Sequence, residues 1–272
     1  MPIISKITAA KKKKGRFHIY LKTEEGEEYA FSVSEDLLVN EHLLKGKELT
    51  EEDIERLKEK DDVDKAMQKA LNYLSYRMRS EGEITRYLRD QEVSEGDIAD
   101  IIDRLRELQF IDDLRFAEAF VRTKRDTAKK GPLLIEQELY QKGVSQHHID
   151  RAMKEYAEET QLDHAIKMVE KKQSSYKKEG TKKKQQKLMQ FVIQRGYPQS
   201  VASKAVAEAE LETDPEAEWE GLVKHGEKAW NKFSGKEDWE RIQRVKQQLY
   251  TRGFTSEKIE EWLTYKKEKE EE

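Results

Sequence analysis

The apolar residues at the start of the chain alternate with polar ones, as they do in half-buried β-strands. An apolar run spans Ile3 to Ala9, and a polar stretch centred on Gly26 separates two alternating segments. The alternating apolar positions are Phe17, Ile19, Leu21, Tyr29, Phe31 and Val33. This pattern predicts a small N-terminal β-hairpin region.

The pattern changes after these strands. A linking stretch follows, in which Thr50 precedes an acidic turn that is typical of the start of a short helix. From Asp62 onward, apolar residues recur with the period of an α-helix. The rest of the chain is therefore expected to be helical.

The helical part contains an internal repeat around a glycine-containing turn. In each copy, five apolar residues follow one another at spacings of 4, 5, 5 and 4. The copies are Ile84, Leu88, Val93, Ile98 and Ile102; Ile135, Leu139, Val144, Ile149 and Met153; Leu188, Val192, Tyr197, Ala202 and Val206; and Val245, Leu249, Phe254, Ile259 and Leu263. Only 36% of the chain is hydrophobic, so this agreement indicates a repeated structural unit.

The repeated spacing predicts two helices joined by a tight corner. Three copies have Gly143, Gly196 or Gly253 just before the central apolar residue, where a helix ending in the left-handed conformation favours glycine. Glu92 occupies that position in the first copy. The residues expected to begin the next helix are Ser94, Ser145, Pro198 and Thr255.

The first helix of each pair also has a start signal. Ser80 with Glu83 and Ser234 with Glu237 have the spacing of capping boxes, while Gly131–Pro132 and Thr181 open the other two helices. A further apolar-periodic segment precedes each of these starts, which makes four three-helix repeats. We predict a mainly α-helical fold of tandem three-helix repeats that form an elongated solenoid, with a small N-terminal β-hairpin region. The predicted divisions are 1–60 for the hairpin extension and short helix, then 61–108, 109–158, 159–212 and 213–272 for the repeats.

The 272 residues include 52 Lys and Arg and 56 Asp and Glu, so the net charge is only −4 although 40% of the chain is charged. Basic residues gather between the first and second helices of the repeats, and acidic residues gather at the end of the third. Stacked repeats would then carry a basic edge and an acidic edge. Most of these charges also fit ordinary surface ion pairs. The exceptions are Lys124, Arg125, Lys129 and the lysines from 171 to 187, for which contact with a polyanion or a partner is the better interpretation.

The sequence gives no indication of an active site. The absence of cysteine excludes disulfide scaffolds, thiolate metal sites and cysteine nucleophiles, and the histidines lack metal-ligand spacing. No nucleotide-binding or nucleophile motif occurs, so neither catalysis nor a cofactor is expected. Apolar runs are too short to cross a membrane, and a cytoplasmic protein is expected. Tyr73, Tyr76 and Tyr87 fit core packing better than base stacking, and the run Lys11 to Lys14 fits a solvated loop as well as a phosphate contact.

Three runs in the first two repeats are specific enough to suggest a family. They are LSYRMRSEGEITRYL (Leu74 to Leu88), FIDDLRFAEAF (Phe110 to Phe120) and KKGPLLIEQELYQKGV (Lys129 to Val144). These runs resemble RecX, a family of bacterial regulators of the RecA recombinase. The resemblance is strongest over residues 70 to 155, and the third repeat agrees with it in pattern.

The resemblance implies a non-enzymatic, monomeric modulator that binds the RecA filament on single-stranded DNA, with inhibition of recombinase and ATPase activity as the expected direction. It also implies a place in homologous recombination, DNA repair and the SOS response, with direct DNA contact through the basic edge. Charge and resemblance together select the candidate binding residues Arg77, Arg79, Arg115, Arg122, Lys124, Arg125, Lys129, Lys130, Lys142, Lys171, Lys172, Lys182, Lys183 and Lys184.

Two other functions fit the same sequence. A stand-alone nucleic-acid-binding repeat protein would bind DNA without RecA, with an affinity that falls steeply as salt rises. A helical adaptor for an unrelated protein would show neither an effect on RecA nor DNA binding.

Overall fold

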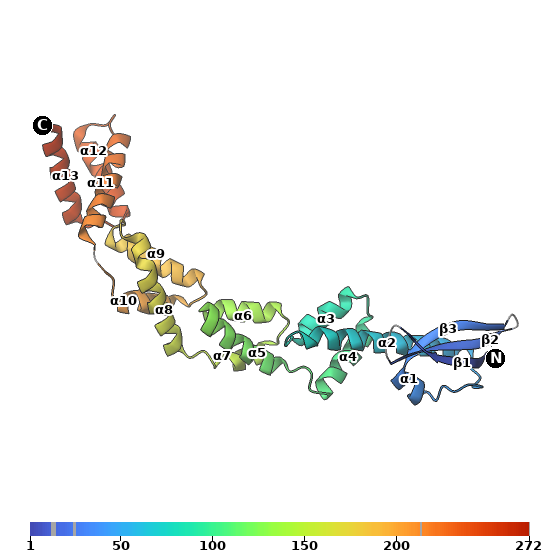
Figure 1. Ribbon diagram of the computed structural model, residues 1–272. Coiled ribbons are helices and arrows are strands. Elements are labelled where there is room, and N and C mark those ends of the chain that lie inside the picture. The colour runs from blue at the N-terminus through green and yellow to red at the C-terminus, as the bar shows by residue number, and fades with distance from the viewer. Residues whose placement is uncertain (12–14, 24–25, 213, 272) are drawn as a thin grey trace. The chain divides into compact units, whose positions relative to one another are not determined.

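The computed structural model describes residues 1–11, 15–23, 26–212 and 214–271 (Figure 1). Residues 12–14 of the predicted lysine loop and residues 24–25 of the predicted hairpin turn lie outside this part of the chain. The chain divides into two compact units. The first contains residues 1–116 with 142–144, and the second contains residues 117–141 with 145–272.

The first unit begins with an antiparallel sheet in the order β1-β2-β3. Its strands are β1 (Ile3–Ala9), β2 (Arg16–Thr23) and β3 (Gly26–Ser34), so the predicted strands are confirmed as one three-stranded sheet. Ile19, Leu21, Phe31 and Val33 are buried on its inner face, as their alternation predicted. The short helix α1 (Glu35–Asn40) adds Leu37 to this core.

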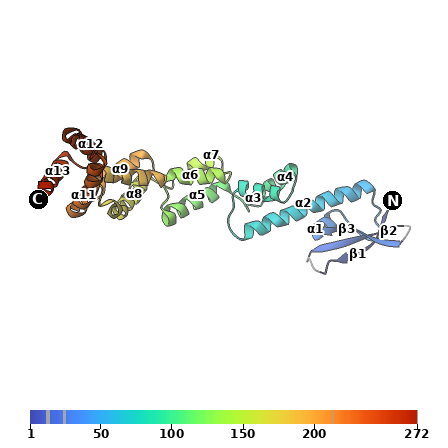
Figure 2. The ribbon, with the colours of Figure 1, turned by 90° about the horizontal axis from the view of Figure 1, so that it is seen from above.

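Helix α2 (Glu51–Ser75) has 25 residues, and Figure 2 shows it as one continuous helix. The prediction of a short helix followed by a separate one is wrong, and the predicted division at residue 60 falls inside α2. The start is as predicted, because Thr50 and Asp53 form a capping box. Leu57 packs in the core of the sheet, whereas Ala66 and Ala70 pack in the core of the first repeat. No glycine or proline interrupts the sequence between these positions, so one helix serves both cores.

The remaining helices form three-helix groups (Figure 1). They are α3 (Glu81–Asp90) and α4 (Glu95–Glu107) after α2; α5 (Asp113–Thr123), α6 (Pro132–Gln141) and α7 (Gln146–Met153); α8 (Glu158–Lys172), α9 (Thr181–Gln194) and α10 (Gln199–Glu208); and α11 (Pro215–Lys232), α12 (Asp238–Thr251) and α13 (Ser256–Glu271). A π-helix, η1 (Lys124–Ala128), follows α5, and a 3-10 helix, η2 (Gln173–Tyr176), follows α8. Every apolar position of the predicted spacing is buried except Val93 and Met153, which are half-buried. The mainly helical repeat fold is therefore confirmed.

The corners have the predicted backbone conformation. Gly143, Gly196 and Gly253 have φ angles of 82°, 90° and 86°. Glu92 has the same left-handed conformation, with φ of 63°, although a side chain disfavours it. The predicted capping box at Ser234 is wrong: α12 begins after Glu237, and that N-cap side chain makes no capping bond.

Glycine is required at the later corners for a second reason, which is close packing between repeats. In the second unit, a Cβ on Gly131 would lie 2.2 Å from the carbonyl carbon of Gly196. The Gly131 N–H also donates to the carbonyl oxygen of Arg195 over 2.8 Å. The pairs Gly180–Gly253 and Gly82–Gly143 approach one another in the same way. Glu92 is exposed, so the first corner carries only the conformational penalty.

Candidate protein and nucleic-acid interface

In the first unit, two candidate residues converge on Glu83 near the start of α3. Arg77 lies 2.8 Å and Lys142 lies 2.9 Å from the Glu83 carboxylate. Burial alone would raise the pKa of Glu83, but hydrogen bonds from Arg77, Lys142 and the Ser80 N–H lower it to about 2. The Ser80 hydroxyl also donates to the Lys142 carbonyl over 2.6 Å. These bonds make Arg77 and Lys142 parts of a structural junction.

Arg79 also contributes to packing. Its guanidinium carbon lies 3.9 Å from the ring centre of Tyr73, and the Tyr73 and Tyr87 rings stack with centroids 4.2 Å apart. Packing therefore accounts for two of the three tyrosines considered for base stacking, whereas Tyr76 is 84% exposed. Arg115 is strongly exposed and lies 3.4 Å from Asp112, which supports the start of α5.

Most basic side chains between α5 and α6 are bound to acidic groups of the same unit. Arg122 lies 3.2 Å from Glu155, and both Lys124 and Lys130 contact Glu138. Arg125 pairs with Asp126 at 2.6 Å and donates to the Glu155 carbonyl oxygen over 2.7 Å. Arg122 and Arg125 therefore link this segment to the end of the repeat, and Lys124 and Lys130 link it to α6.

Lys129 differs from these four neighbours, because its exposed side chain has no carboxylate oxygen within 4.0 Å among the described residues. Its backbone is left-handed, with φ of 47°. The Tyr197 hydroxyl donates to the Lys129 carbonyl oxygen over 3.0 Å and thereby holds the corner in place. A strained backbone that is held by buried contacts is a common feature of functional positions.

A buried hydroxyl cluster supports this corner. The Tyr156 hydroxyl lies 3.0 Å from that of Tyr197 and 3.2 Å from His164 Nδ1. Burial raises the pKa of both tyrosines, and burial followed by the Lys129 charge lowers the pKa of His164. The repeat spacing predicts only a core position for Tyr197. The available signal was a hydroxyl at a repeat position that is Val, Val or Phe in the other copies.

The candidates around α8 and α9 form a different environment. Within the described parts of the chain, no carboxylate oxygen lies within 4.0 Å of their ammonium groups. Lys172 lies 5.6 Å from the ring centres of Tyr176 and Phe191, and Lys182 lies 5.2 Å from that of Tyr250. The Lys184 ammonium donates to the Glu212 carbonyl oxygen over 2.7 Å. We call the set Lys171, Lys172, Lys182, Lys183 and Lys184 the lysine cluster.

The other lysines of this segment show that pairing is selective. Lys177, Lys178 and Lys187 contact Asp214, Glu220 and Glu179, respectively. The sequence predicts the lysines from 171 to 187 as one group, because ion pairs between distant segments are not visible in a linear pattern. The structure divides them into paired residues and the lysine cluster.

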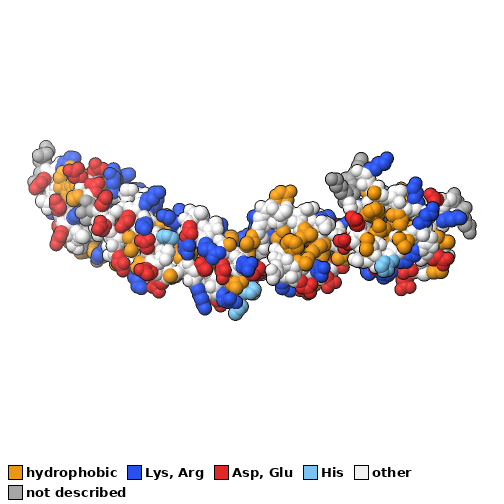
Figure 3. Space-filling model, turned by 60° about the horizontal axis from the view of Figure 1, so that its bottom comes forward, with side chains coloured by type: hydrophobic (Ala, Val, Ile, Leu, Met, Phe, Trp, Pro, Cys, Tyr) orange, Lys and Arg blue, Asp and Glu red, His pale blue; other side chains and the backbone are white. Residues whose placement is uncertain are grey.

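The charges of the second unit do not separate into a basic edge and an acidic edge as predicted. Arg122 belongs to the predicted basic edge and Glu155 to the acidic one, yet the two side chains contact each other. On the face shown in Figure 3, Lys and Arg side chains are interspersed with Asp and Glu side chains. Oppositely charged side chains of this unit therefore pair locally instead of forming two separate edges.

Two kinds of site are absent from the described part of the chain. Its His, Asp and Glu side chains form no group of three or more that could hold a metal ion. Its helices include none with the length and apolar character needed to cross a bilayer.

Family models match the chain along most of its length. The RecX N-terminal domain matches residues 2–50, the first three-helix domain 66–105 and the second 112–153. The third three-helix domain matches twice, at 159–206 and 216–263. The second of these matches contains α12, most of α11 and the first half of α13, so the fourth repeat resembles the third.

Similar proteins cover nearly the whole chain. A protein named regulatory protein RecX from Halalkalibacterium halodurans is 39% identical over 97% of this chain and 99% of its own. The protein of the same name from Bacillus cytotoxicus is 36% identical over 98% of both chains. A crystal structure of regulatory protein RecX matches 76% of this chain and all of its own, with 36% identity and a TM-score of 0.68. The RecX structure from Lactobacillus salivarius matches 56% of this chain and 99% of its own, with 32% identity and a TM-score of 0.54. The chain therefore belongs to the RecX family of regulatory proteins.

Proposed function

We propose that this protein is a non-enzymatic regulator that binds the RecA filament on single-stranded DNA and inhibits its recombinase and ATPase activities. The observation that carries the proposal is the family match, which includes the N-terminal domain and every three-helix repeat. The protein acts in the cytoplasm as a monomer, within homologous recombination, DNA repair and the SOS response.

The lysine cluster is the proposed contact with the DNA phosphates of the filament. Its ammonium groups are not neutralised by carboxylates of the described residues. Binding to phosphates can therefore release condensed counterions without first breaking an internal ion pair. Lys129, whose backbone is fixed by Tyr197, supplies a further cation at a defined position. The candidates that contact carboxylates or, for Arg79, an aromatic ring have a secondary role in binding; they are Arg77, Arg79, Arg115, Arg122, Lys124, Arg125, Lys130 and Lys142.

The proposal is tested by adding the purified protein to RecA on single-stranded DNA. We expect a concentration below that of RecA to reduce DNA-dependent ATP hydrolysis and strand exchange. A RecA mutant that cannot form filaments serves as the background control for ATP hydrolysis. Unchanged hydrolysis and strand exchange at equimolar protein would contradict the proposal.

A second function is supported by the lysine cluster itself, which could bind nucleic acid without RecA. In that case the affinity for single-stranded DNA falls steeply with salt when RecA is absent. Binding without any effect on RecA activity would favour this second function over the first.

A further inference from the structure

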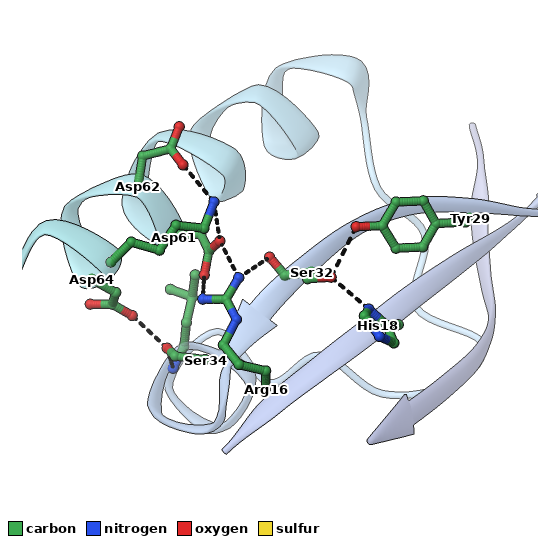
Figure 4. Close-up of polar contacts among 10 residues, drawn as sticks. Arg16, His18, Tyr29, Ser32, Ser34, Asp61, Asp62 and Asp64 are labelled. Atoms are coloured by element: carbon green, nitrogen blue, oxygen red, sulfur yellow. Dashed lines mark hydrogen bonds and ion pairs between the residues drawn. The ribbon is translucent and has the colours of Figure 1, made fainter. Parts of the chain in front are cut away.

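The N-terminal sheet and helix α2 enclose a cleft that the proposed function does not use. The cleft has a volume of about 1030 Å³. It is bounded by the outer face of the sheet, the end of β1 and the middle of α2, and Figure 4 shows the polar contacts around it. All of its walls belong to the first unit.

Aromatic rings stand on the sheet side of the cleft because of a β-bulge. Ile19 pairs with Phe31, but the next residue, Tyr20, pairs with Tyr29, so Ala30 is the extra residue. The bulge interrupts the alternation that predicted Tyr29 on the inner face, and this side chain is instead 57% exposed. The Tyr29 ring lies edge-on to His18 and Tyr20, with centroids 5.7 Å and 6.0 Å away.

Polar contacts hold these rings in place. The Ser32 hydroxyl lies 2.9 Å from the Tyr29 hydroxyl and 2.7 Å from His18 Nδ1 (Figure 4). The Ser32 hydroxyl on β3 therefore restrains both the Tyr29 and the His18 rings. The Tyr29 ring can therefore offer an exposed aromatic surface with little loss of side-chain entropy when a ligand binds.

A buried ion pair fixes the opposite wall. Arg16 on β2 makes a bidentate contact with Asp61 on α2, at 2.6 Å and 2.7 Å (Figure 4). Asp61 is 2% exposed, and Lys65 lies 3.0 Å from its second oxygen. A bidentate pair restrains orientation as well as distance, so α2 is held across the end of the sheet.

The cleft is also basic. Lys11, two residues after β1, and Lys58 on α2 are exposed, and among the described residues neither has a carboxylate oxygen within 4.0 Å. Lys65 lies two helical turns after Lys58 on the same helix. Asp61 and Asp62 are the acidic side chains of the lining, and both contact Lys65. The cleft therefore combines the exposed Tyr29 ring and the half-buried Tyr20 ring with ammonium groups that no carboxylate of the described residues pairs.

We propose that this cleft is a binding site for single-stranded DNA, in which bases stack on Tyr29 and Tyr20 and phosphates contact Lys11 and Lys58. Aromatic side chains on a sheet beside basic residues are the combination that unpaired strands require. A duplex keeps its bases stacked and cannot present their faces to the rings. An acidic peptide would use the lysines but not the exposed rings. This site is distinct from the lysine cluster and does not require RecA.

The test compares two single strands of equal length, a thymidine oligonucleotide and its abasic analogue, by fluorescence anisotropy with the full chain and no RecA. The abasic strand carries the phosphates without the bases. We expect the wild-type protein to bind the thymidine strand more tightly than the abasic strand. Tyr29→Ala should weaken binding of the thymidine strand about 5- to 150-fold and leave the abasic strand unaffected.

Matched variants separate stacking from other effects. Tyr29→Phe keeps the ring, removes the bond to Ser32 and should retain most of the affinity. Lys58→Glu should weaken both strands, because it opposes the phosphates. Lys182→Glu with Lys183→Glu in the lysine cluster should change both affinities by a similar factor and preserve their ratio. Circular dichroism and thermal melting verify the fold of each variant.

Equal binding of the two strands by the wild-type protein would overturn the proposal. Unchanged binding of the thymidine strand by both Tyr29→Ala and Lys58→Glu would also overturn it. An effect on RecA ATP hydrolysis tests the proposed function separately, so the two ideas can fail independently.

Discussion

The second and third repeats both carry many basic residues between their first and second helices, but they use them differently. In the second repeat, Arg122, Lys124, Arg125 and Lys130 contact acidic groups or backbone oxygens of neighbouring helices. In the third repeat, the lysine cluster faces aromatic rings, a carbonyl oxygen or solvent. Similar sequence composition thus supports the fold in one repeat and leaves charge for a partner in the other.

The largest loss of stability is expected when an ion-paired cation of the second repeat is reversed in charge. Arg125→Glu removes the bond to the Glu155 carbonyl and places a carboxylate beside Asp126. We expect the free energy of unfolding to fall by about 2–3 kcal/mol, measured by chemical denaturation. Lys171→Glu is the matched reversal in the lysine cluster and should change stability by less than about 0.5 kcal/mol. Equal losses for the two variants would remove the distinction between the repeats.

A smaller loss is expected where the two repeats meet. Tyr197→Phe removes the hydroxyl that donates to Lys129 and contacts Tyr156. Because buried groups then lose a hydrogen-bond partner, the free energy of unfolding should fall by about 1–2 kcal/mol. Thermal melting of Tyr197→Phe measures this loss of stability. Phe191→Leu, which changes a half-buried ring in the same repeat, is the control. A melting temperature equal to that of the wild type would show that the hydroxyl cluster does not hold the corner.

The first corner offers a gain of stability instead of a loss. Glu92 has a left-handed backbone, is exposed and is not packed against a neighbouring glycine. Glu92→Gly should therefore raise the free energy of unfolding by about 1 kcal/mol. The reverse change at a later corner, Gly196→Ala, combines an unfavourable φ with contact against Leu134 and should destabilise the protein. A loss of stability in Glu92→Gly would contradict this account of the corners.

The smallest effect concerns pH. The pKa of His164 is lowered from its ordinary value of 6.5 in the folded protein. At pH values between these two pKa values, the unfolded chain therefore binds more protons than the folded protein. Stability should therefore decrease as the pH falls below 6.5 and increase as the pH rises again. The contribution is below about 1 kcal/mol. Denaturation at several pH values should show a shallower dependence for His164→Gln, and identical slopes would exclude this contribution.

Local patterns predicted most of the fold. The repeat spacing identified the buried positions. The corner glycines and the caps at Thr50, Ser80 and Ser145 could be predicted because each depends only on residues nearby in the sequence. The continuity of α2 was not predicted, because its two halves pack in different cores. The exposure of Tyr29 was also missed, because a bulge changes register without a marked sequence signal.

The candidate site was predictable only as a set of basic residues. Pairing depends on residues that are distant in sequence, such as Arg122 with Glu155 and Lys178 with Glu220. The sequence therefore could not separate the cations that support the fold from those available to a partner. The rings of the N-terminal cleft were likewise assigned to strands without any expectation of a ligand.

The most direct test of the central claim is a titration of RecA-catalysed, DNA-dependent ATP hydrolysis with the wild-type protein and two double variants. Lys182→Glu with Lys183→Glu alters the lysine cluster, whereas Lys69→Glu with Lys267→Glu makes the same charge change at exposed positions elsewhere. We predict that the first variant requires a concentration about 10- to 100-fold higher for half-maximal inhibition, while the second behaves as the wild type. Equal inhibition by all three proteins would contradict the account.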